Sequence, residues 1–189
     1  MAHIRTLIPI TPTRTLIAVL ALLLSLALPE QSAAQAGPHL RVLDHVLKAV
    51  LDRGTAQSPT LQKLVAEIET TRILVFAECS MRMPSGVGGR MNFVTNANDY
   101  RFVRIAIDCM LTERWQITLL AHELQHALEI GRNPDVVDVE AMESLYEEIG
   151  YPTSREGGIR HFETEAAIIV QRAVERELEG RGTPAALAY

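Results

Sequence analysis

The hydrophobic pattern of the chain changes its period near Leu111, and this change constrains the fold more than any other feature. Before it, residues 100–107 alternate regularly between an apolar face and a more polar one. Such alternation predicts a strand with one buried face, and the turn residues 96–99 predict a hairpin with a second strand over 92–95. After Leu111 the apolar residues recur at helical spacing. The chain is therefore expected to be α+β, with a small hairpin or sheet packed on a mostly helical domain.

The remaining elements are predicted from periodicity and from residues that begin or end helices. Arg53-Gly54 is expected to end the first helix, Ser58-Pro59 to open the second, and Asn133-Pro134 to open the last but one. A Gly-rich loop at residues 81–91 is either a surface connection or a lid. The last helix is expected to bury a face that includes Ile169. In chain order, the predicted helices and the one strand outside the hairpin cover residues 40–51, 58–70, 73–77 (the strand), 112–130, 134–149 and 160–179.

The N-terminal residues have the three parts of a secretory signal peptide. Arg5 and Arg14 precede an uninterrupted apolar run at residues 16–28, Pro29 ends the run, and a small-residue stretch closes at Ala36. The run is shorter than the about 20 apolar residues that a membrane-spanning helix usually needs, so cleavage after Ala36 is expected. The chain is thus predicted to be secreted or periplasmic. Its parts are then a signal peptide at 1–36, one domain at 37–180 and a flexible tail at 181–189.

Composition excludes several classes of protein. The chain is 48% hydrophobic with a net charge of −5, so neither a disordered protein nor a nucleic-acid binder with a basic surface is expected. Two cysteines are too few for a disulfide scaffold. In an oxidising compartment Cys79 and Cys109 are nevertheless expected to form a disulfide, because each follows a strand-like run. Two buried, inert thiols are the alternative.

One short motif carries chemistry. Residues 122–126 read His-Glu-Leu-Gln-His within a predicted amphipathic helix. His122 and His126 are four residues apart, so they share one helical face and can bind one Zn²⁺, while Glu123 can reach a water molecule on the metal. Zinc would lower the pKa of that water and polarise a substrate carbonyl, and Glu123 would act as general base. The alternative is a solvated helix face on which two histidines and a glutamate occur by coincidence.

The motif resembles that of the zincin metallopeptidases, in the branch whose third ligand is a glutamate on a following helix. It differs from the metzincins, because Arg132 stands where they have a third ligand. The resemblance is confined to about residues 112–150, and it is closest to the small, minimal zincins. It implies a zincin-like fold, with an edge strand above the active helix that holds the substrate backbone in an extended form. The segment at residues 100–107 is the candidate for that strand.

The third ligand is sought on the helix that follows the motif. If this helix runs back antiparallel from Pro134, the level of the metal falls near residue 141, since the helix rises about 1.5 Å per residue. The nearest carboxylates are Asp138, Glu140 and Glu143, of which Asp138 has the shortest reach. Glu140 is therefore predicted as the third ligand. Glu143 is the reserve, or a partner that orients a histidine.

Other roles are not assigned by any motif. Tyr146, Tyr151 and His161 are candidates for stabilising an oxyanion, although each is more often structural. Trp115 is expected to anchor the core.

The sequence thus predicts an exported, zinc-dependent peptidase acting on a peptide or protein substrate, with no nucleic acid or membrane partner beyond the signal peptide. An exported zinc-binding relative of the zincins, without peptidase activity, is the main alternative. Retention of Glu123 argues against it, since a structural zinc site does not need a general base and usually has four protein ligands. The oligomeric state stays open.

Overall fold

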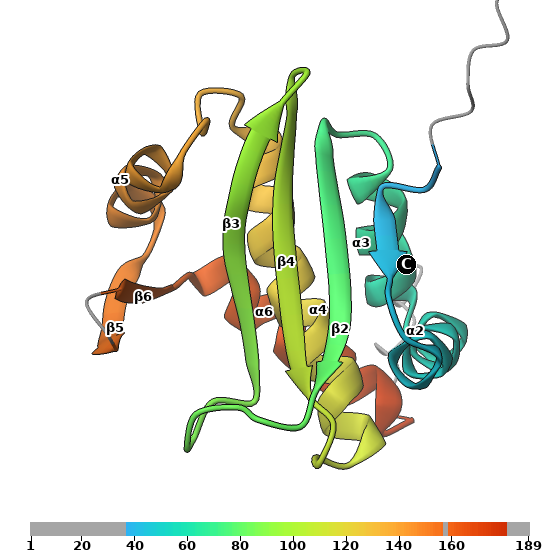
Figure 1. Ribbon diagram of the computed structural model, residues 1–189. Coiled ribbons are helices and arrows are strands. Elements are labelled where there is room, and N and C mark those ends of the chain that lie inside the picture. Colours follow the sequence, from blue (N-terminus) through green and yellow to red (C-terminus); the bar gives the residue numbers. More distant parts are fainter. Residues whose placement is uncertain (1–36, 157–158, 181–189) are drawn as a thin grey trace, which may run out of the picture. The chain divides into compact units, whose positions relative to one another are not determined.

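The described part of the chain, residues 37–156 and 159–180, forms a four-stranded sheet, a two-stranded hairpin and five helices in the computed structural model (Figure 1). The predicted signal peptide and tail lie outside these residues. None of the described helices is long and apolar enough to cross a membrane. The elements are β1 (Leu40–Val42), α2 (His45–Gln57), α3 (Pro59–Ile68), β2 (Ile73–Ser80), β3 (Gly89–Ala97), β4 (Tyr100–Asp108), α4 (Glu113–Arg132), α5 (Val139–Ile149), β5 (Tyr151–Glu156), β6 (Ile159–Glu163) and α6 (Glu165–Leu178).

The main sheet has the order β1-β2-β4-β3. β1, β2 and β4 are parallel, and β3 pairs antiparallel with β4 at the edge. The predicted hairpin is confirmed: Asn98 and Asp99 both have positive φ, the geometry that matches the twist of a tight hairpin. β4 lies inside the sheet, so the prediction that residues 100–107 form the edge strand is wrong; β3 and β1 are the two edge strands.

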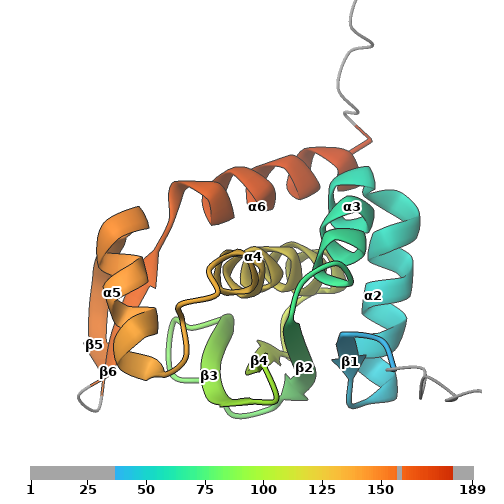
Figure 2. The same cartoon turned by 90° about the horizontal axis from the view of Figure 1, so that it is seen from above.

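Helix α4 is the centre of the domain. Figure 2 shows it between the main sheet and α6, with α2 and α3 on one side and α5, β5 and β6 on the other. It extends the predicted helix by two residues, because Gly131 and Arg132 remain helical and Asn133 is the C-cap. Every residue from Gln116 to Ile130 except Leu119 is buried, so this one helix has the sheet on one face and helices on another. A helix covered nearly all round positions its polar side chains rigidly.

At the N-terminal side, the predicted helix over 40–51 is wrong in its first residues. Leu40–Val42 pair with β2 as a strand, and Asp44 caps α2 by accepting a hydrogen bond from the Leu47 amide. α2 also continues past Gly54. A side chain at Gly54 would collide with Leu61 and Ile117, which shows that this glycine allows close helix packing rather than ending the helix. The second helix, capped by Ser58 with Pro59 in its first turn, is confirmed.

The C-terminal predictions need two corrections. The helix expected from Pro134 begins only at Val139, because the Asp138 side chain caps it and Asn133 instead donates to the Glu129 carbonyl. The helix expected over 160–179 begins at Glu165, since residues 159–163 pair with β5 as β6. Ile169 is 54% exposed, so it does not lie on the buried face of α6.

The disulfide Cys79–Cys109 is confirmed, with the two Cα atoms 5.5 Å apart. It joins the ends of the adjacent parallel strands β2 and β4. Trp115 is 48% exposed on the first turn of α4, so the expectation that it anchors the core is wrong.

Candidate metal centre

Helix α4 carries three polar side chains that are buried although they can bear charge. His122, Glu123 and His126 are only 9%, 7% and 6% exposed. The two imidazole rings lie with their centroids 4.9 Å apart, because residues four apart share one helical face. Buried ionisable groups of this kind require partners, which come partly from α4 itself and partly from outside the helix.

The carboxylate of Glu163 completes the group. It stands at the end of β6, where its Oε2 lies 3.4 Å from His122 Nε2 and its Oε1 lies 3.6 Å from His126 Nε2. One ligand atom from each residue lies within 4.8 Å of the other two. A tetrahedral zinc site with ligand distances of about 2.0–2.1 Å has edges of about 3.3–3.4 Å between ligand atoms. The two distances from the Glu163 oxygens are close to this spacing, so the three residues could hold a metal ion of that size.

The second ring nitrogen of His126 is held by a glutamate that the sequence analysis missed. His126 Nδ1 lies 3.0 Å from Glu129 Oε2, and Glu129 Oε1 accepts hydrogen bonds from Thr164 Oγ1 at 2.8 Å and Gln125 Nε2 at 3.3 Å. A carboxylate on the far nitrogen fixes the orientation of a ligating imidazole. The signal was present in the sequence, since Glu129 is three residues after His126 on the same helical face.

The electrostatics of the group favour positive charge. Burial lowers the pKa of His126, but hydrogen bonds with Glu129 and Glu163 outweigh it and raise the pKa to about 10. Burial and the neighbouring His126 lower the pKa of His122. Burial raises the pKa of Glu163, but the two histidines lower it more, so it lies below its ordinary value. The carboxylates thus create a negative potential that a bound cation would satisfy.

Glu123 lies beside the histidines and points toward the edge strand β3. A Cβ at Gly89 would lie 2.8 Å from Glu123 Oε1, so the glycine leaves room for this carboxylate beside the strand. Burial raises the pKa of Glu123 to about 7, against the opposing effects of His126 and of a hydrogen bond from the Met91 backbone. A carboxyl with a pKa near neutrality is suited to accept and return a proton.

These residues open into a cavity of about 590 Å³. Its floor is α4, one wall is β3 with the preceding loop from Gly86, and the opposite wall comes from α5, β5 and β6, which lie beside the edge of the sheet in Figure 1. The Gly-rich loop predicted at 81–91 thus contributes its second half to the cavity and to β3. The two histidines and Glu123 are thus buried at the base of the cavity, and β3 lines one of its sides.

The structure does not bring Glu140 to the histidines. It lies exposed in the first turn of α5, because that helix begins five residues later than expected. Glu143, the reserve, lines the cavity, but its carboxylate accepts hydrogen bonds from Arg160. Glu163 lies where Glu140 was expected, and it was missed because residues 160–163 were assigned to a helix.

The three candidates for stabilising an oxyanion are separated by the structure. Tyr146 is buried and its hydroxyl donates a hydrogen bond to the His126 carbonyl at 3.0 Å, so it supports the helix that carries both histidines. Tyr151 is 48% exposed and does not line the cavity. His161 does line it.

The arrangement defines a class of site: two histidines one helical turn apart, a carboxylate from a distant segment as the third member, and a glutamate beside the histidines that faces an edge strand. Comparison with protein-family models, with curated proteins and with solved structures finds no match to this chain.

Proposed function

We propose that the protein is a zinc-dependent peptidase in which His122, His126 and Glu163 hold the metal and Glu123 is the general base. The observation that supports this most directly is the position of Glu123 between the histidine pair and the free edge of β3. Two imidazoles and one carboxylate, leaving a coordination position open, favour zinc over other divalent ions. When bound, zinc would polarise the substrate carbonyl and lower the pKa of a water molecule.

The chain's own residues would then perform the remaining steps. Glu123 takes a proton from the attacking water and returns it to the leaving amine. β3 has β4 on one side only, so the backbone groups of its other edge can pair with an extended peptide. Glu129 keeps the His126 ring in the orientation that ligation needs.

We also propose that the protein acts outside the cytoplasm. The sequence pattern of residues 1–36 is that of a signal peptide, and the disulfide Cys79–Cys109 is a bond that persists mainly in oxidising compartments.

Two measurements test the proposal and separate it from a binding module that lacks peptidase activity. Mass spectrometry of the purified protein should find about one zinc per chain, and His126→Ala should lose it. Glu123→Gln should keep the zinc but lose cleavage of a mixed peptide library that the parent protein digests. Zinc binding with no cleavage by the parent would support the binding module, and no zinc after reconstitution would overturn both.

A further inference from the structure

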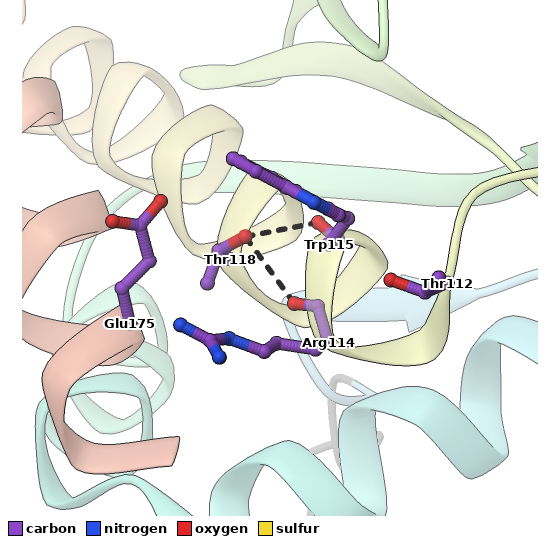
Figure 3. Close-up of a pocket in the computed structure, with 5 residues that line it drawn as sticks. All are labelled: Thr112, Arg114, Trp115, Thr118 and Glu175. Atoms are coloured by element: carbon purple, nitrogen blue, oxygen red, sulfur yellow. Dashed lines mark hydrogen bonds between the residues drawn. The ribbon is translucent and has the colours of Figure 1, made fainter. Parts of the chain in front are cut away.

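A second hollow, of about 290 Å³, lies beside the first two turns of α4 (Figure 3). It is lined by Thr112, Arg114, Trp115, Thr118 and Glu175. This volume is at the lower end for a small-molecule site and suits a single long side chain. Trp115 presents a half-exposed indole here, which no packing requirement explains.

The two charged side chains that line this hollow, Arg114 and Glu175, differ in their partners. Arg114 is neutralised by an ion pair with Glu179, with 2.5 Å between Nη2 and Oε1. Glu175 accepts a hydrogen bond from Gln171, a neutral group, and among the described residues it forms no ion pair. The Thr118 hydroxyl is bonded to carbonyls of its own helix and offers no donor. The lining therefore includes one aromatic ring, one carboxylate that forms no ion pair among the described residues, and the Arg114 guanidinium, whose charge is balanced by Glu179; Figure 3 shows these lining side chains.

This hollow lies in line with the metal centre. Trp115, Leu119 and His122 recur at i, i+4 and i+7, so they share one face of α4. On α6, Glu175 lines the second hollow and its hydrogen-bond partner Gln171 lines the main cavity. Seven residues of helix separate Trp115 from His122, or about 10 Å, which an extended peptide spans with about three residues.

We infer that Trp115 and Glu175 form a subsite for a lysine or arginine side chain of the substrate, about three residues from the bond that is cleaved. This inference rests on the proposed peptidase function, because only a peptidase has a cleaved bond from which the subsite can be counted. The indole face would bind the cation through its π electrons, and the Glu175 carboxylate would pair with it. The net charge of −5 on the chain also favours approach of basic peptides.

Binding can be measured without turnover, because Trp115 is the only tryptophan of the chain. The full protein carrying Glu123→Gln is titrated with the acetylated, amidated peptide Gly-Gly-Lys-Gly-Gly and with its norleucine counterpart, while tryptophan fluorescence is followed. The lysine peptide should bind about tenfold more tightly, the combined effect of one cation–π contact and one exposed ion pair. Glu175→Gln should abolish that preference. Glu148→Gln removes the same charge from an exposed helical position outside the hollow and should leave it intact.

Equal affinity for the two peptides, no saturable response, or an unchanged preference in Glu175→Gln would overturn the subsite. Cleavage is then measured with peptides that carry one lysine at successive positions. A chain that binds lysine but cleaves nothing overturns the peptidase and keeps the binding site. A chain that cleaves with no preference for lysine about three residues from the bond overturns the subsite and keeps the peptidase.

Discussion

Replacing Glu163 by glutamine removes the one proposed ligand that α4 does not supply. The substitution keeps the size of the side chain but replaces a charged oxygen ligand by a neutral amide. Structural zinc sites with four ligands bind with about 10–16 kcal/mol, or roughly 3–4 kcal/mol for each ligand. Glu163→Gln should therefore weaken zinc binding by about a hundredfold to a thousandfold.

The matched control is Glu140→Gln, the same chemical change at an exposed position of α5. Zinc affinity is measured for the parent and both variants by competition with a chromophoric chelator. Far-ultraviolet circular dichroism of the metal-free proteins verifies that the fold is kept. If Glu163→Gln bound zinc within threefold of the parent, or if Glu140→Gln lost it, the assignment of the third ligand would be refuted.

Three other perturbations test the surroundings of the site. Gly89→Ala should lower peptidase activity at least about tenfold while zinc content stays unchanged, because its new methyl group would displace Glu123, and steady-state kinetics with metal analysis measures both. The double variant Cys79→Ser/Cys109→Ser should lose about 3–4 kcal/mol of unfolding free energy in a urea titration; a loss below 1 kcal/mol would contradict this. Removal of zinc by a chelator should increase hydrogen exchange in β6, where Glu163 lies, but not in β2, whereas equal exchange in both states would argue against metal anchoring of β6.

The parts of the fold that were predicted are those that neighbouring residues encode. The β3–β4 hairpin follows from alternation and from two turn residues that tolerate positive φ. The His122–His126 pair follows from the geometry of a single helix, which fixes the spacing of residues four apart whatever surrounds them. Neither prediction needed to know how distant segments pack.

The short strands β1 and β6 were not predicted, because their residues also fit a helical period. Phe162, Ala166 and Ile169 continue at helical spacing into α6, although Ile169 is exposed in the structure. Whether a segment of five residues forms a strand depends on its pairing with a neighbouring strand. Here that neighbour is β5, whose polar sequence lacks the apolar alternation that would predict a strand. Thr164 was the available boundary signal, since a threonine followed by Glu-Ala-Ala is a good helix N-cap.

That same threonine explains why Glu163 could be placed only by the tertiary structure. Thr164 caps α6 by accepting a hydrogen bond from the Ala167 amide, and its hydroxyl donates to Glu129, the residue that orients His126. One hydroxyl thus joins the start of α6 to the ligand helix, and it holds the adjacent Glu163 beside both histidines, 37 residues from the nearer one. Glu140 was predicted because the helix that follows α4 in the sequence was expected to pack beside the two histidines. Because Asp138 caps α5, that helix begins at Val139 and Glu140 lies at the surface. The carboxylate beside the two histidines comes instead from Glu163, whose position depends on the buried hydrogen bond between Thr164 and Glu129.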